Sequence, residues 1–355
     1  MKRIILFAAC LCFSAVACQT NLAPETEAGT GSLRISLVPA GTPGTKSVTD
    51  ATGKEDYLKD VQVFIFQTDG TLYRREVFPE NTATRSLDGV KAGYYDLVAV
   101  ANAPAMAEIQ TRNELRQQTV ALSLNNPEAG FVMYGEAANT VTVLSNSDTP
   151  SNVSIALERH VSRVRLTTVQ NKLPADCGPL TVESVFLENG LGSWTLLASD
   201  EPSSYVNYAG RKAGCNTSTV ADDFIAAAAD AECAALTFKA PQQAVARSLT
   251  AAESFNLPFY SYPNRLSLTA DHFAGPTADA VCARLVLRVS YGTPAESWYY
   301  PVTLPGMARN TSYDVSFVIS GPGTKDPNQR VSNGNLDVAV TITGWGNGTS
   351  YQGDF

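Results

Sequence analysis

Short segments in which apolar and polar residues alternate, separated by turn-forming Gly, Pro, Asn and Asp, constrain the fold of this chain more than any other feature. A period of two places the apolar side chains on one face of a strand and the polar ones on the other. Residues 33–37 (LRISL) and 161–169 (VSRVRLTTV) show this pattern plainly. Many such segments at fairly regular spacing are typical of sandwiches and barrels rather than of alternating strands and helices. The sequence therefore predicts an all-β fold with a few short helices.

Strands are expected wherever this alternation, or a denser apolar run, stops at a turn-forming residue. Short helices are expected at residues 109–118 and at the alanine-rich residues 221–235. The expected strands span residues 33–37, 61–66, 71–78, 93–102, 131–136, 138–144, 153–159 and 161–169 in the first half, and 180–188, 194–197, 235–238, 259–262, 282–291, 298–304, 313–319 and 336–344 in the second.

The strand pattern lapses at residues 170–177, which are polar and contain a proline. A chain of 355 residues is long enough for two domains of about 150 residues each. We therefore expect two β-sandwich domains in tandem, of the transthyretin-like or Greek-key type, at residues 32–169 and 170–355.

The first residues, 1–17, have the features of a secretory signal. A basic start is followed by an apolar stretch, residues 4–16, that is shorter than the about 20 residues of a spanning helix. Small residues precede Cys18, which is the arrangement of a lipoprotein signal. In that interpretation several acyl chains, such as palmitate, anchor Cys18 in the outer membrane, and residues 18–31 form a flexible polar tether. The alternative is an ordinary signal peptide in which Cys18 merely lies near the cut.

The acidic character of the chain, with a formal net charge of -8, argues against a nucleic-acid partner, because no basic stripe is present. The two histidines are His160, expected to be a surface imidazole, and His272. None of the common zinc, phosphate-loop, dinucleotide-binding or nucleophile-elbow motifs occurs. We therefore expect no enzyme, no cofactor and no metal site.

Two aromatic runs, residues 259–263 (FYSYP) and 298–300 (WYY), leave two interpretations open. Aromatic rings can stack on sugars, or they can form the core face of a strand with tyrosines at its rim. The first interpretation would make the protein a glycan binder, and the second gives the runs a purely structural role.

Four cysteines follow Cys18, all in the second half of the chain: Cys177, Cys215, Cys233 and Cys282. Their spacings match no zinc signature, and an oxidising compartment allows disulfides. Cys215 with Cys233 is the expected pair. The alternative is that the thiols are unpaired and packed as small apolar groups.

Several short motifs, each weak alone, occur in an order and spacing that are fairly specific. Together with Cys18 and a basic residue in the loop after the first strand, they resemble the fimbrillin family of Bacteroidetes fimbriae, the FimA/Mfa-like pilins, over nearly the whole mature chain. The motifs lie at residues 61–66 (VQVFIF) with 69–70 (DG), 99–103 (AVANA), 133–136 (MYGE), 157–164 (LERHVSRV), 259–264 (FYSYPN), 299–302 (YYPV) and 309–313 (RNTSY).

This resemblance implies a lipoprotein precursor in which a trypsin-like protease cuts the loop after the first strand. Loss of that strand opens a groove, which a strand of the next subunit fills. On this sequence the implied cut follows Lys46, with Lys54 as the second choice, whereas the family commonly has Arg there. The implied donor is the C-terminal segment with Val338, Val340 and Ile342, which suits the closing strand of its own domain equally well.

The sequence as a whole thus predicts a structural subunit of a cell-surface fimbria that polymerises by strand addition and supports adhesion. The expected partners are other fimbrial subunits, outer-membrane lipid, the processing protease and a host glycan or protein receptor. The alternative is a surface lipoprotein that does not polymerise and acts as a glycan-binding adhesin or as a tip or anchor subunit of the fimbria.

Overall fold

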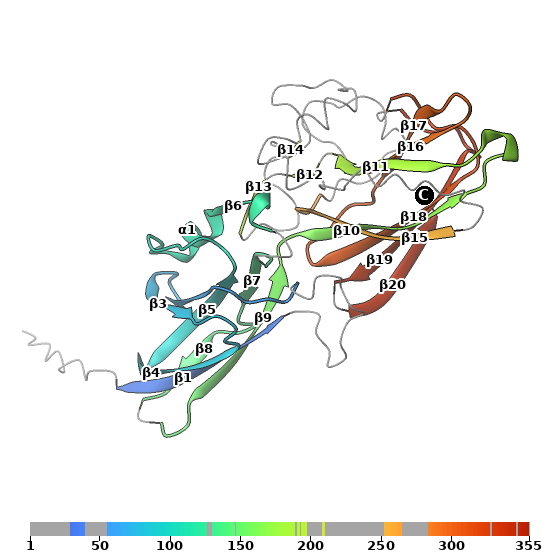
Figure 1. Cartoon of the computed structure of the whole chain (residues 1–355). Coiled ribbons are helices and arrows are strands. Elements are labelled where there is room, and N and C mark those ends of the chain that lie inside the picture. The colour runs from blue at the N-terminus through green and yellow to red at the C-terminus, as the bar shows by residue number, and fades with distance from the viewer. Residues whose placement is uncertain are drawn as a thin grey trace, which may run out of the picture.

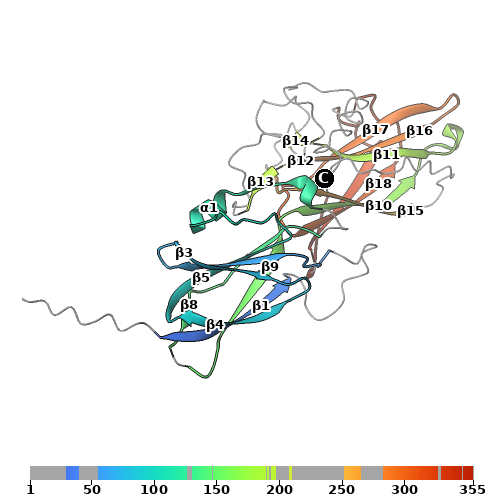
Figure 2. The ribbon, with the colours of Figure 1, turned by 60° about the vertical axis from the view of Figure 1, so that its left-hand side comes forward.

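The computed structural model describes residues 29–39, 55–125, 130–145, 147–188, 190–191, 193–196, 208–209, 252–264, 283–326, 329–345 and 347–354. Nearly every element in these residues is a β-strand, which confirms the predicted all-β class. The strands form two groups that lie end to end (Figure 1), and a view turned by 60° separates the same two groups (Figure 2). The expected helix at 221–235 and strand at 235–238 lie outside the described residues.

The N-terminal group is an 8-stranded sheet in the order β3-β2-β5-β7-β9-β1-β4, with β8 beside β5. All neighbours in it are antiparallel except β1 and β9, which run parallel. The helix α1 (Arg112–Gln117) begins with a capping box in which Thr111 and Glu114 satisfy each other's backbone N–H groups. The strands are β1 (Thr30–Pro39), β2 (Val61–Gln67), β3 (Leu72–Phe78), β4 (Thr84–Lys91), β5 (Gly93–Ala101), β7 (Met133–Glu136), β8 (Val141–Val143) and β9 (Ser151–Arg159).

The C-terminal group contains a 5-stranded sheet, β15-β10-β18-β19-β20, and a 3-stranded sheet, β11-β16-β17. Its strands are β10 (Ser162–Asn171), β11 (Thr181–Glu188), β15 (Ala252–Ser261), β16 (Arg284–Tyr291), β17 (Glu296–Thr303), β18 (Thr311–Ile319), β19 (Leu336–Gly344) and β20 (Asn347–Asp354). The minor elements are β6 (Thr119–Ala121), β12 (Gly190–Leu191), β13 (Ser193–Thr195), β14 (Tyr208–Ala209) and the 3-10 turns η1 (Leu122–Leu124) and η2 (Ala175–Cys177).

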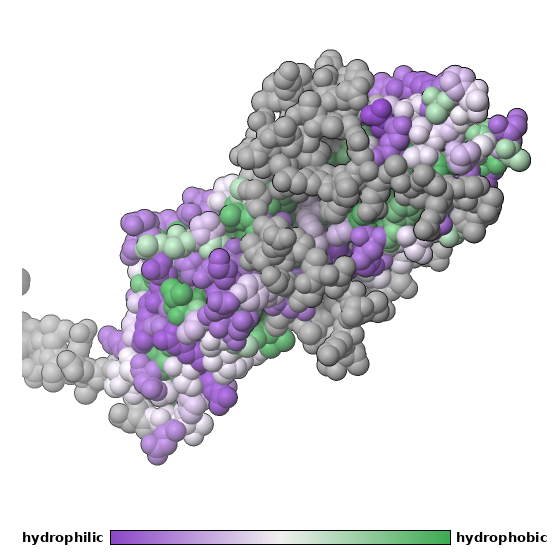
Figure 3. Space-filling view, in the orientation of Figure 1, coloured by the Kyte–Doolittle hydropathy of each residue, from purple (hydrophilic) through white to green (hydrophobic). Residues whose placement is uncertain are grey.

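Among the described residues, three large apolar cores hold these sheets together, and a fourth, small cluster consists of Phe186, Val286 and Tyr299. In the N-terminal group, inward side chains of β1, β4 and β9 pack against those of β2, β5, β7 and β8, so the sheet folds over into two facing layers. A second core fills the C-terminal group between its two sheets. A third lies between the groups, where the outer faces of β2 and β5 meet Trp194, Tyr260, Tyr262 and Trp345 of the second half. On the face shown in Figure 3, hydrophobic residues appear in small separate patches among hydrophilic ones.

The two groups share one strand plan. In each, the first strand lies in the middle of three, antiparallel to one neighbour and parallel to the last strand of the plan. In the first group this gives β4-β1-β9, and in the second it gives β15-β10-β18. The hairpin β19-β20 is added to the outside of β18, beyond the shared plan.

The hydrogen-bonded partners change between β9 and β10, at His160 and Val161, because β10 pairs with β15 and β18 of the second group. The predicted domain boundary near residue 170 falls inside β10 (Ser162–Asn171). That the chain divides into two independent folding units there stays a prediction. Residues 84–91 form the strand β4, which the alternation of apolar and polar residues did not predict. Its two buried apolar side chains, Leu87 and Val90, do not follow a period of two.

Substitution of Gly135 tests the close contact between β7 and β9. A Cβ atom on this residue would lie 2.0 Å from the carbonyl oxygen of Ala156, so Gly135→Ala forces the backbone apart. We expect the free energy of unfolding to fall by about 1–3 kcal/mol, the usual cost of overpacking, as measured by urea denaturation of the full chain. Gly93→Ala is the control, because its Cβ meets atoms at 3.5 Å or more. Equal stability of the two variants would contradict the contact.

Candidate functional site

The strand β1 occupies an inner position of the sheet, between β4 and β9. Its ladder with β9 runs in parallel from Leu33 to Pro39, and its antiparallel ladder with β4 runs from Thr30 to Ser36. The first strand of the chain is therefore not an edge strand of this sheet. Removal of β1 would leave unpaired backbone groups on two neighbouring strands instead of one.

The inward face of β1 carries the apolar side chains Leu33, Ile35 and Leu37, with exposed fractions of 0%, 0% and 2%. They lie in the core that joins both layers of the N-terminal group. Burial of an aliphatic side chain contributes about 1.5–3 kcal/mol. The three side chains therefore account for a large part of what holds β1, and their loss would leave three apolar sites empty.

Gly31 fixes the position of β1 along its neighbours. A Cβ atom on Gly31 would lie 2.1 Å from the carbonyl oxygen of Leu144 and 3.1 Å from Cγ1 of Val143. The ladder with β4 also shifts register between Gly31 and Leu33. This position therefore accepts glycine only, because no other residue leaves room for the Leu144 carbonyl.

The proposed processing residues flank this strand in the sequence. Cys18 precedes β1, and Lys46 and Lys54 follow it. All three lie outside the described residues, and their roles stay predictions. The chain is described again from Glu55, directly after Lys54.

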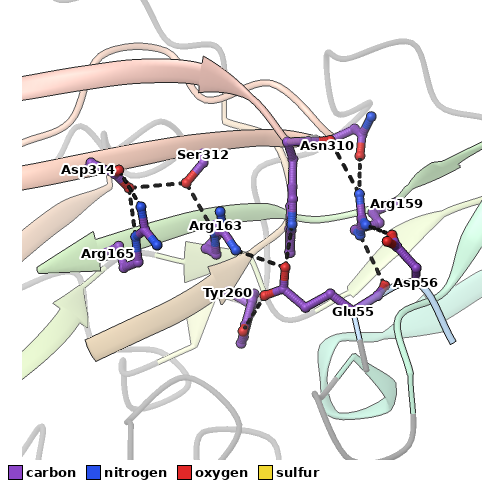
Figure 4. Close-up of polar contacts among 10 residues, drawn as sticks. Glu55, Asp56, Arg159, Arg163, Arg165, Tyr260, Asn310, Ser312 and Asp314 are labelled. Carbon is purple, nitrogen blue, oxygen red and sulfur yellow. Dashed lines mark hydrogen bonds and ion pairs between the residues drawn. The ribbon is translucent and has the colours of Figure 1, made fainter. Parts of the chain in front are cut away.

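The carboxylate of Glu55 is buried between the two strand groups, 6% exposed, and accepts hydrogen bonds from side chains of other elements. Arg163 Nη1 lies 2.8 Å from Oε2, the indole Nε1 of Trp345 donates to the same oxygen at 2.6 Å, and the hydroxyl of Tyr260 donates to Oε1 at 3.1 Å. Figure 4 shows Arg163 and Tyr260 converging on Glu55. Because a buried charge is costly unless it is paired and hydrogen-bonded, this arrangement ties the chain at Glu55 to residues of the second half.

A second arginine completes the junction. Arg159 Nε donates to the backbone oxygen of Glu55 at 3.1 Å, its Nη1 donates to Asn310 Oδ1 at 3.0 Å, and its Nη2 pairs with Asp56 (Figure 4). The guanidinium groups of Arg159 and Arg163 lie 4.7 and 4.8 Å from the centre of the Trp345 ring. Cation–π attraction of this kind strengthens when the groups are desolvated. Trp345, which follows β19 directly, is thereby held by both arginines and by Glu55.

Polar contacts continue from this junction along β10 and β18. Arg163 Nε donates to Ser312 Oγ at 3.1 Å, and Arg165 forms a two-fold ion pair with Asp314, with Nε to Oδ1 at 2.9 Å (Figure 4). A bidentate pair of this type fixes orientation as well as charge. The network therefore sets the position of β18, on which β19 lies.

The candidate donor residues Val338, Val340 and Ile342 lie in β19, which pairs with β18 on one side and with β20 on the other. The segment is thus an inner strand of its own sheet in this structure. Its role as a donor stays a prediction, and it requires β19 to leave both neighbours.

The aromatic runs belong to the interior. Phe259, Tyr260 and Tyr262 are buried, and burial raises the pKa of Tyr262 well above its usual range. In the second run Tyr299 and Tyr300 are buried, and the half-buried ring of Trp298 is covered by Lys325, whose Nζ lies 3.5 Å from its centre. The core interpretation of both runs is therefore correct for this structure, and neither run presents free ring faces to a sugar.

Two further expectations are decided for described residues. His160 is buried, 1% exposed, with Nε2 2.8 Å from the carbonyl oxygen of Thr195, so the expected surface position was wrong. Cys177 is half-buried and carries no disulfide. The expected Cys215–Cys233 pair lies outside the described residues, as does Cys282.

Among the described residues, no group of three or more His, Cys, Asp or Glu side chains is placed to hold a metal ion. No helix among them is long and apolar enough to cross a membrane. This part of the molecule combines an extended strand buried between two neighbours with a polar junction that fixes the chain at Glu55, on the C-terminal side of that strand.

Comparison with known families matches residues 25–350 to the model of the fimbrillin-A associated anchor proteins Mfa1 and Mfa2. No curated protein sequence matches the chain. The fold is similar to that of a fimbrilin (FimA) from Porphyromonas gingivalis, with a TM-score of 0.59 and 15% identity over 90% of this chain and 98% of that one.

Two further solved structures share the fold. A candidate cell adhesion protein from Bacteroides eggerthii has a TM-score of 0.60 and 16% identity, over 89% of this chain and 96% of that one. A fimbrial assembly protein from Parabacteroides distasonis has a TM-score of 0.51 and 14% identity, over 88% and 98%. At these identities the similarity concerns the fold alone.

The variant Glu55→Gln tests whether the buried carboxylate holds the junction. It keeps the size of the side chain but removes the negative charge with which Arg163 is paired, and breaking a buried pair in this way costs about 3–5 kcal/mol. We expect a loss of that order in the free energy of unfolding, measured by urea denaturation followed through indole fluorescence. Asp60→Asn, an exposed neighbour, serves as the control. If both variants unfold at the same urea concentration, Glu55 does not hold the junction.

Proposed function

The chain belongs to the family of fimbrillin-A associated anchor proteins Mfa1 and Mfa2, and from this premise we propose that it is a polymerising structural subunit of a fimbria. The family places it among fimbrial components of the cell surface, which are structural proteins and not enzymes. The observation that carries the proposal is the inner position of β1 between β4 and β9.

Exchange of β1 is the proposed assembly step. Residues 40–54 join β1 to Glu55, so a cut after Lys46, or in second place after Lys54, separates the strand from the rest of the chain. A trypsin-like protease supplies this cut. Departure of β1 then exposes the unpaired edges of β4 and β9 and leaves three empty apolar positions in the core. These features favour binding of an extended segment of another subunit.

The junction around Glu55 supports this order of events. Glu55 follows the proposed cut sites and is bound by Arg163, Tyr260 and Trp345, whereas the contacts of β1 belong to its own ladders and core. Cleavage before Glu55 therefore leaves the new N-terminal segment docked while β1 departs.

The lipid anchor belongs to the precursor in this scheme. Cys18 precedes β1 in the sequence, so a cut at Lys46 removes the acylated residue together with the strand. We propose that the lipid holds the precursor at the outer membrane until processing, and that the processed subunit works in the filament. Adhesion to a host protein or glycan is the proposed use of the filament.

An anchor subunit is the second candidate, because the matched family is described as anchor proteins. If the chain is an anchor subunit, its loop is not cut, and it keeps both β1 and the lipid on Cys18. A glycan-binding adhesin gains less support, since the aromatic runs that suggested it are buried or covered.

Replacement of Lys46 by Ala separates these possibilities. We expect the precursor to remain as stable as the wild type but surface filaments to disappear, because β1 cannot leave. Electron microscopy of cells measures the filaments, and mass determination of sheared material gives the mature terminus, expected at Ser47. Lys54→Ala is the matched control and should leave filaments unchanged. Filaments that persist in Lys46→Ala would refute the assigned cut. If the wild-type chain is recovered only in the membrane fraction, uncut and beginning with acylated Cys18, the result would favour the anchor.

A further inference from the structure

Glu55, the first residue described after β1, is tied to the rest of the fold through both its side chain and its main chain (Figure 4). The residue is 6% exposed. Its carboxylate is bound by Arg163, Tyr260 and Trp345. Its backbone oxygen accepts a hydrogen bond from Arg159 Nε at 3.1 Å. Movement of this residue away from the fold therefore breaks several buried polar contacts at once.

The residues that follow Glu55 are attached as well. Asp56 pairs with Arg159. The backbone oxygen of Tyr57 accepts a hydrogen bond from Asn102 Nδ2 at 2.7 Å, and Asn102 Oδ1 accepts one from the backbone N–H of Lys59 at 2.9 Å. The chain is thus held by the fold at residues 55, 56, 57 and 59.

A protease binds several residues on each side of the bond that it cuts, in an extended conformation. Burial and hydrogen bonding of the backbone therefore decide which bonds of a folded protein can be cut. When a segment opens and closes rapidly, the rate of cutting follows the population of its open form. A bond beside a firmly held segment is cut slowly, because that segment must first leave the fold.

The two candidate cut sites differ in their distance from the contacts of Glu55. Lys54 directly precedes Glu55, so a cut after Lys54 requires residues 55–57 to enter the protease. Residues 47–54 separate Lys46 from Glu55. A cut after Lys46 places Ser47 and the residues next to it in the protease, and the contacts of Glu55 stay intact.

We propose that the contacts of residues 55–57 decide where the chain is processed. They shield the bond between Lys54 and Glu55 from a trypsin-like protease and leave the bond after Lys46 as the site of cutting. Glu55 is then a specificity-determining residue of processing, and Tyr260 acts through it as a positioning residue. This inference rests on the proposed function, since that function requires a cut between β1 and Glu55.

Removal of a single hydroxyl group tests the shielding. Tyr260→Phe keeps the aromatic ring but removes the hydroxyl that donates to Glu55 Oε1. The purified full-length chain is treated with dilute trypsin, and mass spectrometry measures the initial rates at which chains beginning with Ser47 and with Glu55 appear. In the wild type we expect the Glu55 terminus to form about a hundredfold more slowly than the Ser47 terminus. In Tyr260→Phe the Glu55 terminus should form about tenfold faster than in the wild type, with the Ser47 rate unchanged.

Tyr262→Phe is the matched control. Its hydroxyl group is also buried, donates to the backbone oxygen of Val120 at 3.0 Å and accepts from Asn125 Nδ2 at 3.1 Å, and neither contact involves Glu55. The variant loses buried hydrogen bonds in the same region of the molecule, so it reports what a general loss of stability does to the digestion. We expect its Glu55 terminus to form as slowly as in the wild type.

A second variant moves the bond and leaves the contacts unchanged. Insertion of Gly-Ser-Gly-Ser between Lys54 and Glu55 separates the bond after Lys54 from the contacts of Glu55 by up to about 13 Å of extended chain. Neither candidate bond then lies beside a residue of the junction. We expect the cut after Lys54 to proceed within about threefold of the rate after Lys46 in this variant.

The outcomes separate this inference from the proposed function. Preferred cutting after Lys46, with faster cutting after Lys54 in Tyr260→Phe and in the insertion variant, supports the shielding. Equal cutting after both lysines of the wild type overturns it. So does an insertion variant that stays uncut after Lys54, or a Tyr260→Phe chain that behaves as Tyr262→Phe. If the wild type is cut after neither lysine but the insertion variant is cut after Lys54, the shielding stands and the proposed cut after Lys46 falls.

Discussion

The burial of β1 between β4 and β9 is the constraint on which the rest of this structure depends. Three fully buried aliphatic side chains and two ladders hold the strand. Its only covalent link to the rest of the fold is the segment from residue 40 to residue 54. A strand in this position is essential to the core and yet can be separated by one cut. In the proposed assembly, that combination lets one chain give both a stable precursor and an assembly-competent subunit.

The junction between the strand groups complements this separable strand. Glu55 receives hydrogen bonds from Arg163, Tyr260 and Trp345, three residues far apart in the sequence. Networks of buried polar groups rigidify a structure when every member is satisfied. Glu55, which follows the proposed cut sites, and Trp345, which follows β19, are therefore held in one cluster.

Local patterns were sufficient to predict the all-β class and most strands: the period of two of half-buried strands for β1 and β19, and a dense apolar run for the buried strand β2. The strand β4 was not predicted, because this outer strand buries only two apolar side chains. The inner position of β1 and the buried state of His160 arise from pairing between distant segments, which no local pattern encodes. The sequence around Glu55 has no feature that distinguishes it from an ordinary loop carboxylate, and Arg159 lies in a family motif that assigns it no role. The close packing at Gly31 left no sequence signal beyond the glycine itself.

The central claim, that the site of β1 is filled by a strand of another subunit in the working assembly, is tested most directly by a cryo-EM map of filaments formed by this chain. The account predicts a strand between β4 and β9 whose density continues into the neighbouring subunit, with the residues before the cut absent. A map in which each subunit keeps its own β1 between β4 and β9, and contacts its neighbours elsewhere, would contradict it.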